Sequence, residues 1–439
     1  MPKDYSKPES GTIKIFARSV RKHATPADTT NADEENSKPL PWMVYLQGGP
    51  GHPCRSPQAY PFTTTVLDKG YQLLFLDQRG TGLSTPVTAS TLGLRGSTDV
   101  QAAYLRLYRA DSIVRDLEAI RQTLTAGVPL AQQKWSTMGQ SYGGFITVTY
   151  LSLHPEGLRE CFIYGGLQPL VREPDEVYRR LYRKVIARNE VYYAKYPEDI
   201  GRVRRVLRYL RRFGDGAIKL PDGGELTARR FQQLGLHLGF HGGVDSVHDV
   251  VLRAAEDVEA FGHLTRPTLS AIARLTNFDD NLLYAIMHEP IYCVGRAPRW
   301  AAHRVRDEFP QFELDESRLD EKQGEDVQPV YFTGEMIYPW MFSDYGELRK
   351  VAAVAERVAA EEGWGELFDE AQLARNEVPV YAAAYVEDMY VEYEYSRQTA
   401  AAINGCRMFA TNVMYHNALG DKAKEVVEQL FALRDDVID

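Results

Sequence analysis

The chain has few cysteines and no long apolar run. Its four cysteines are Cys54, Cys161, Cys293 and Cys406, and no two of them form a Cys-x-x-Cys pair. We therefore expect no zinc site, and reduced thiols are typical of a cytoplasmic protein. No stretch reaches the about 18 apolar residues that cross a bilayer, and the N-terminus has no apolar core of a secretory signal. We expect neither a membrane partner nor export by that route.

The chain also has fewer basic than acidic residues, 51 against 60. The formal net charge of the chain is −9 at pH 7, which disfavours nucleic acid and anionic membranes as partners. A hydrophobic content of 44% over 439 residues is enough for a large buried core in more than one structural unit. These patterns specify no oligomeric state.

What the chain does contain is an alternation of short apolar runs with amphipathic stretches. Residues 42–46 and 71–76 are continuous apolar runs, which are typical of strands buried on both faces of a parallel sheet. Helical spacing predicts a helix over 111–124, with Asp111 or Ser112 as its N-cap. The other predicted elements are strands at 12–17, 161–164, 378–385 and 406–410, a surface loop at 23–39 and a last helix at 422–433.

The pattern changes between residues 171 and 375, where long charged helical stretches predominate. Examples are 175–194, 249–261 and 345–362. We interpret this block as a mainly helical cap domain inserted into an α/β core with a mostly parallel sheet flanked by helices. Ligands of open α/β sheets bind beyond the carboxyl ends of the strands, where such an insertion forms a roof. The predicted division is 1–170 core, 171–375 cap and 376–439 core.

Ser141 is the candidate nucleophile. The apolar run that starts at Trp135 breaks into Gly139-Gln140-Ser141-Tyr142-Gly143 and then resumes, which predicts a strand, a sharp turn and a helix. The flanking glycines allow a tight turn that presents the serine hydroxyl at the sheet edge. The bare pattern arises by chance in roughly one chain in seven of this length, so its meaning depends on partner residues.

A serine nucleophile needs a histidine to take its proton and a carboxylate to orient that histidine. In this kind of fold the chain order is serine, carboxylate, histidine. Asp388 follows the predicted strand at 378–385, and His416 follows the last predicted strand. The other histidines precede the serine, lie on its helix or fall in the cap, whereas Glu387 and Glu392 are rival carboxylates. The alternative is that all of these are ordinary surface residues.

The oxyanion of the tetrahedral intermediate needs backbone N–H donors, and losing one donor costs ~3 kcal/mol. The loop Gly48-Gly49-Pro50-Gly51 directly follows a buried strand and can supply the N–H of Gly49. The N–H of Tyr142, next to the nucleophile, supplies the second. The alternative interpretation of the glycine loop is a simple turn.

Three motifs together resemble those of the proline iminopeptidases (prolyl aminopeptidases) of the α/β-hydrolase superfamily. They are Leu46-Gln47-Gly48-Gly49-Pro50-Gly51, Asp77-Gln78-Arg79-Gly80-Thr81-Gly82-Leu83-Ser84 and Gly139-Gln140-Ser141-Tyr142-Gly143-Gly144. The similarity extends over nearly the whole chain and is greatest to the longer subgroup. It implies a triad of Ser141, Asp388 and His416, in agreement with the strand order. Gln47 departs from the histidine that many relatives carry there.

The resemblance implies hydrolysis, without metal or organic cofactor, of the bond after an N-terminal residue, preferably proline. Its substrates would be peptides with a free N-terminal proline, whose charged amine requires a carboxylate. Glu289 and Glu335 best match the cap glutamates that the family uses, although both can be read as surface charges. Candidates for the proline pocket, for which core packing is an equal alternative, are Tyr142, Cys293, Tyr338, Trp340 and Phe342.

Two rivals stay open at this stage. The first is another hydrolase on the same scaffold, such as an esterase or an aminopeptidase of different specificity. The second is a catalytically silent binding protein that kept the fold, against which the complete set of serine, acid, histidine and oxyanion donors argues.

Overall fold

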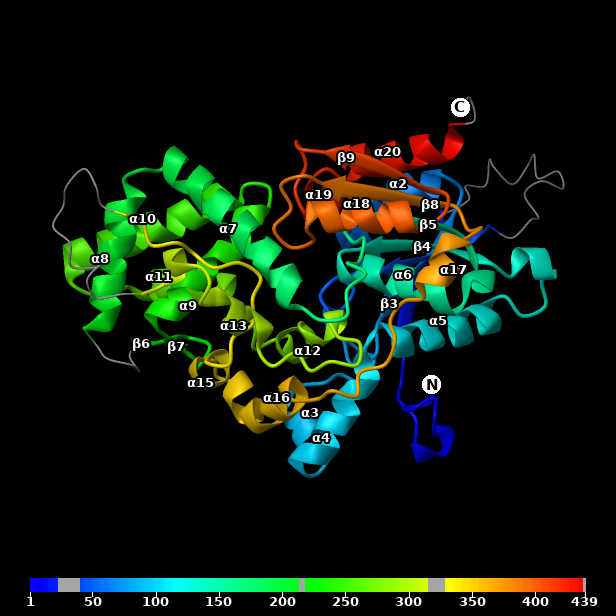
Figure 1. Ribbon diagram of the computed structural model, residues 1–439, viewed down its shortest axis with the longest axis horizontal. Coiled ribbons are helices and arrows are strands. Elements are labelled where there is room, and N and C mark those ends of the chain that lie inside the picture. Colours follow the sequence, from blue (N-terminus) through cyan, green and yellow to red (C-terminus); the bar gives the residue numbers. More distant parts are fainter. Residues whose placement is uncertain (23–39, 213–217, 315–327, 437–439) are drawn as a thin grey trace.

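The centre of the molecule is a seven-stranded sheet (Figure 1). The computed structural model describes residues 1–22, 40–212, 218–314 and 328–436, so the predicted loop at 23–39 lies outside the described residues. The strand order is β1-β3-β2-β4-β5-β8-β9, with β1 antiparallel to β3 and all other neighbours parallel. The strands are β1 (Phe16–Val20), β2 (Trp42–Leu46), β3 (Gln72–Asp77), β4 (Trp135–Gln140), β5 (Leu158–Tyr164), β8 (Val380–Tyr385) and β9 (Cys406–Thr411). The predicted mostly parallel sheet is confirmed.

The sheet has a separate hydrophobic core on each face. Along β2, Val44 and Leu46 belong to one core, whereas Met43 and Tyr45 belong to the other. Successive side chains of a strand point to opposite faces, so a strand buried on both sides must be apolar throughout. The apolar runs in the sequence therefore predicted the central strands well.

The helices of the core cover both faces. The first core includes side chains of α5 and α6, and the second includes those of α2 and α20. The predicted N-cap of α5 is wrong: the helix begins at Ala110, and Arg109 precedes it with no side-chain cap. The core helices are α2 (Thr63–Asp68), α3 (Ala89–Gly93), α4 (Thr98–Leu105), α5 (Ala110–Leu124), α6 (Tyr142–Leu153), α18 (Tyr393–Ala402), α19 (Ala418–Asp421) and α20 (Ala423–Asp435).

The first predicted strand, at 12–17, is shifted. β1 begins at Phe16, and its register pairs Phe16 with Asp77 of β3. β1 is an edge strand and most of its residues are only half-buried, so its own apolar pattern is weak. Its position is set by the partner strand, which the local sequence does not reveal.

Between β5 and β8 the chain forms a large, mainly helical cap, drawn mostly in green and yellow in Figure 1. A small antiparallel pair, β6 (Ile218–Lys219) and β7 (Glu225–Leu226), lies within it. The predicted helix at 345–362 is shorter than expected, because only α16 and a preceding 3-10 turn form there. The helices are α7 (Asp175–Lys195), α8 (Asp199–Arg211), α9 (Ala228–Gln232), α10 (Gly243–Phe261), α11 (Arg266–Leu275), α12 (Leu282–Met287), α13 (Ala301–Arg306), α15 (Met341–Asp344), α16 (Ala352–Ala359) and α17 (Glu370–Ala374).

Cap and core meet over a broad contact. α16 packs against α4 of the core, and α17 packs against α6 and α18. α17 thus lies on the core although it precedes residue 375, and the domain boundaries stay a prediction. Within the described residues, no helix is long and apolar enough to cross a membrane.

The turn that carries Ser141 depends on close backbone packing. A Cβ atom at Gly143 would lie 1.9 Å from the carbonyl oxygen of Leu46, and one at Gly144 would lie 2.3 Å from that of Gly166. Helix α6 therefore approaches β2 and the segment after β5 more closely than any larger residue permits. The glycines of the motif are needed for this packing.

Replacing Gly143 by alanine is expected to destabilise the protein by roughly 1–3 kcal/mol, because neither backbone segment can move freely. The matched control is Gly201→Ala in α8, where nothing lies within 4 Å of the Cβ position and alanine favours the helix by about 0.5–1 kcal/mol. Thermal unfolding measures both variants. Equal midpoints for the two would contradict the packing account.

Candidate active site

Ser141 occupies the turn between β4 and α6. Its backbone has φ 53° and ψ −123°, which is a strained conformation for a residue with a side chain. The N–H of Ser141 donates to the carbonyl oxygen of Tyr164 at 3.0 Å, which ties the turn to the end of β5. A serine held in this way at the end of a strand projects its hydroxyl above the sheet.

Asp388 and His416 form a buried pair at the ends of β8 and β9. Nδ1 of His416 donates to Oδ2 of Asp388 at 2.7 Å. The other oxygen, Oδ1, accepts the backbone N–H groups of Tyr390 at 2.8 Å and Val391 at 3.0 Å. The carboxylate is therefore fully hydrogen-bonded, and it fixes the tautomer that leaves Nε2 of His416 free to accept a proton.

The dipeptide Gly165-Gly166 brings the serine and the histidine together. A Cβ atom at Gly165 would lie 3.4 Å from Nδ1 of His416. A Cβ atom at Gly166 would lie 3.0 Å from the backbone nitrogen of Ser141. Of these two adjacent residues after β5, one lies beside the His416 ring and the other beside the backbone of Ser141. Ser141 and His416 therefore lie on the same edge of the sheet.

The pKa of His416 reflects opposing effects. Burial lowers it, but the charge of Asp388, the hydrogen bond to Asp388 and the charge of Glu335 outweigh burial and leave the pKa above its usual value. A more basic imidazole is a better proton acceptor for a serine hydroxyl.

The glycine loop after β2 runs alongside the nucleophile. A Cβ atom at Gly48 would lie 3.6 Å from Oγ of Ser141. On its other side the loop meets α12 of the cap, since a Cβ atom at Gly51 would lie 2.6 Å from that of Leu283. Tyr142 is the first residue of α6, and N–H groups in a first helical turn have no partner within the helix. The oxyanion roles of Gly49 and Tyr142 stay predictions.

Glu335 is the cap carboxylate that faces this centre. Oε1 accepts a hydrogen bond from the hydroxyl of Tyr284, and Oε2 lies 3.3 Å from Nε2 of His288. Burial raises the pKa of Glu335, but His288, Tyr284 and His416 together outweigh burial and lower it. Glu335 is therefore ionised at neutral pH, within electrostatic reach of His416.

His52, which follows the glycine loop, lies near Tyr284 and Glu335. Its ring lies 4.9 Å from that of Tyr284. Burial lowers the pKa of His52, Glu335 raises it and His288 lowers it, and the net direction is down. A neutral His52 adds no positive charge beside Glu335.

Glu289 is a helix-capping residue of the cap, and its role in binding the amine stays a prediction. Its oxygens accept the N–H of Ala301 at 3.0 Å and that of Ala302 at 2.9 Å, so it caps the first turn of α13. Burial raises the pKa of Glu289 to about 8, although the two N–H groups act in the opposite direction. Both oxygens of Glu289 are therefore occupied by backbone donors.

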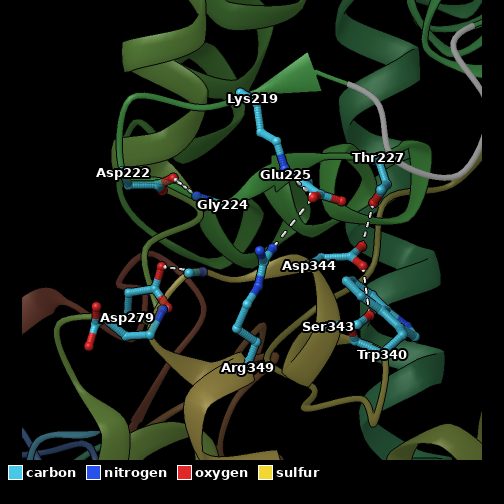
Figure 2. A network of polar contacts seen from close by, with 12 residues as sticks. Lys219, Asp222, Gly224, Glu225, Thr227, Asp279, Trp340, Ser343, Asp344 and Arg349 are labelled. Atoms are coloured by element: carbon cyan, nitrogen blue, oxygen red, sulfur yellow. Dashed lines mark hydrogen bonds and ion pairs between the residues drawn. The ribbon is translucent and has the colours of Figure 1, made fainter. Parts of the chain in front are cut away.

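The predicted aromatic pocket residues also belong mainly to the interior of the cap. The hydroxyl of Tyr338 lies 3.0 Å from that of Tyr182. Figure 2 shows Trp340 beside Ser343 in a polar network of the cap. Phe342 belongs to α15, which is well separated in Figure 1 from α19, the helix that follows His416. These rings pack within the cap, and a role for them in the proline pocket stays a prediction.

Cys293 lies closer to the junction of cap and core. Its carbonyl oxygen accepts a hydrogen bond from Arg109 at 2.6 Å, and its buried thiol donates to the carbonyl oxygen of Glu289 at 3.5 Å. Burial raises the pKa of the Cys293 thiol. It is an unreactive side chain, and a role beside the substrate stays a prediction.

Sequence reasoning missed Tyr284 and His288, which hold Glu335. His288 is one of the cap histidines that the sequence excluded as the catalytic base. The two residues are four positions apart at the end of α12, so they share one face of the helix. That spacing of two polar aromatic residues is the signal that could have revealed them.

One group of potential metal ligands occurs among the described residues, outside this site. It comprises Glu118, His154 and Glu156. Both oxygens of Glu118 already accept hydrogen bonds from Arg121, at 2.7 Å each, so this carboxylate is committed to an ion pair.

Comparisons with known proteins identify the family of the chain. The family model described as the alpha/beta hydrolase fold matches residues 41–287. The chain is 45% identical over its full length to proline iminopeptidase aneH of Aspergillus aculeatus, covering 93% of that protein. It is 39% identical to a proline iminopeptidase of Aeromonas sobria, over 99% of this chain and 95% of the relative.

Among solved structures, an esterase from Exiguobacterium antarcticum matches over 97% of this chain and 96% of its own, with a TM-score of 0.39 and 11% identity. That likeness is too distant to add to the assignment. The full-length relatives are sufficient: the chain is a member of the proline iminopeptidase family, within the α/β hydrolases.

Proposed function

We propose that this enzyme hydrolyses the peptide bond after an N-terminal residue, preferably proline, through an acyl-enzyme on Ser141. The observation that carries the proposal is an ionised carboxylate, Glu335, within electrostatic reach of the histidine of a serine triad. The printed names of the full-length relatives support the preference for proline.

The proposed chemistry follows from the order of the side chains. Oγ of Ser141 attacks the carbonyl carbon of the first residue while Nε2 of His416 takes the hydroxyl proton. The oxyanion accepts the N–H groups of Gly49 and Tyr142. When the C–N bond breaks, His416 returns the proton to the leaving amine, and water then attacks the acyl-enzyme by the same route.

Glu335 would fix the position at which cleavage occurs. A free N-terminal proline carries a positively charged secondary amine close to the scissile carbonyl. An ionised carboxylate beside the triad binds that amine, so that only the first peptide bond reaches Ser141. Blocked peptides lack the charge and lose this contact.

The proposed partners are peptides with a free N-terminal proline, and the proposed location is the cytoplasm. The four cysteines are unpaired, which suits a reducing compartment. An esterase or an aminopeptidase of another specificity is the rival activity, and substrate panels distinguish them.

The nucleophile is tested by Ser141→Ala. We expect the turnover of proline and alanine arylamides to fall by about 10⁶-fold, because nothing else in the triad can form the acyl-enzyme. A fluorophosphonate probe should label the wild type and not the variant. Turnover equal to that of the wild type would eliminate the proposed mechanism.

The amine site is tested by Glu335→Gln, with Glu289→Gln as the matched control. The first variant should lose roughly 2–4 kcal/mol of transition-state binding on proline arylamide, or about 30- to 1000-fold in kcat/KM, and little on an uncharged ester. Glu289→Gln removes one helix-capping acceptor and should affect stability by about 1 kcal/mol without changing this ratio. An even loss on amide and ester in Glu335→Gln would count against the role.

The pH dependence gives a second test of Glu335. General-base catalysis needs neutral His416, so activity falls as the pH drops through the pKa of His416, which Glu335 helps to raise. Glu335→Gln removes this charge, which lowers the pKa of His416. The acid limb of the profile of kcat/KM against pH should therefore move to lower pH. An uncharged ester isolates the effect from amine binding. A limb that stays in place or moves to higher pH would show that Glu335 does not act on His416.

A further inference from the structure

The loop that carries His416 leaves the sheet at its edge. β9 is the last strand of the sheet and most of its residues are only half-buried or exposed. Val413, just before His416, is 71% exposed. The core therefore supports this loop from one side only, although a catalytic histidine needs placement within about 0.5 Å.

A single cap residue, His241, holds the chain on both sides of His416. The backbone N–H of Tyr415 donates to Nε2 of His241 at 3.1 Å. The backbone N–H of His241 donates to Oδ1 of Asn417 at 2.9 Å. The two residues that flank the catalytic histidine are thus bonded to one residue of the cap.

Neighbouring cap residues reinforce this contact. The rings of His241 and Tyr415 meet edge to face at 5.0 Å, and the guanidinium of Arg188 lies 4.9 Å from the centre of the Tyr415 ring. Arg188 also donates to the carbonyl oxygen of Leu238 at 2.9 Å. Helix α7 therefore ties Tyr415 and the segment before His241 into one unit.

The same cap segment also reaches the loop of Asp388. The hydroxyl of Tyr390 donates to the carbonyl oxygen of Leu236, and the Tyr390 ring stacks on Phe240 at 5.0 Å. The Tyr390 ring also lies 4.6 Å from that of His416. Leu236, Phe240 and His241 of the cap thus contact the supports of both the acid and the base.

We propose that His241 is a positioning residue, whose neutral imidazole accepts the Tyr415 N–H and so holds His416 in line with Ser141. Catalytic competence then depends on docking of the cap as well as on the core. This inference rests on the proposed serine mechanism. It assigns His241 no contact with substrate.

The protonation state of His241 agrees with this role. Nε2 accepts a hydrogen bond, so the ring must be neutral with its proton on Nδ1. Burial lowers the pKa of His241, and the charged groups around it are Asp421 and Glu425, which raise it, and Lys422, which lowers it. The net direction is down, so the accepting form predominates at neutral pH.

The test compares His241→Leu, His241→Gln and His241→Asn. Leucine has no acceptor, glutamine carries one near the position of Nε2, and asparagine is too short to reach Tyr415. We expect leucine and asparagine to lower kcat on proline arylamide roughly 10- to 100-fold with KM within about twofold of the wild-type value. Glutamine should restore most of kcat, and the rate of fluorophosphonate labelling should follow kcat in every variant.

The control is His237→Leu, in the same cap segment. His237 is also half-buried, but its Nε2 bonds to the carbonyl oxygen of Leu275 within the cap at 2.8 Å. This variant should keep kcat and labelling within about twofold of wild type. A loss of kcat equal to that of His241→Leu would show that the effect is general destabilisation and would overturn the proposal.

Two further outcomes are decisive. If His241→Leu does not fold, the glutamine and asparagine variants carry the test, and equal kcat in these two would overturn the proposal. Wild-type kcat in folded His241→Leu would do the same. Neither result touches the serine mechanism, which fails only if turnover does not depend on Ser141.

Discussion

The site depends on the negative charges that surround one imidazole. Asp388 bonds to Nδ1 of His416 at 2.7 Å and Glu335 acts on the same ring from the cap. Both carboxylates accept hydrogen bonds from donors of their own: two backbone N–H groups at Asp388, and Tyr284 with His288 at Glu335. A buried charge is tolerable only with such partners.

The core and the cap contribute different groups to this arrangement. In the proposed mechanism the core supplies the nucleophile, the acid and the base from the ends of its strands, as parallel sheets allow. The cap supplies the second carboxylate and much of the support for the catalytic loops. Lys184 of α7, for example, donates to the carbonyl oxygen of Val386 near Asp388 at 2.7 Å. The cap is therefore part of the catalytic architecture as well as a cover over it.

The sequence predicted best what depends on local pattern. Central strands such as β2 and β8 are buried on both faces, and burial on both faces leaves a continuous apolar run. The glycines around Ser141 reflect a backbone approach that admits no Cβ atom. The order of serine, acid and histidine along the chain also selected Asp388 and His416 as partners of Ser141. The structure brings Asp388 and His416 into contact.

What could not be predicted depends on contacts between distant segments. Glu289 and Glu335 look alike in sequence, but one caps α13 and the other faces the triad, because the fold decides which oxygens find backbone donors. The stacking of Trp340 on Tyr338 within the cap is likewise not visible in the local sequence. The support of Tyr415 by His241 joins residues 174 positions apart, and no local pattern carries that information.

The most direct measurement is a crystal structure with pyrrolidine-2-boronic acid, which mimics the tetrahedral intermediate of a proline substrate. The account predicts a bond from boron to Oγ of Ser141, with the ring nitrogen about 3 Å from a carboxylate oxygen of Glu335. A covalent complex whose ring nitrogen faces solvent, or lies against any other group of the cap, would contradict it.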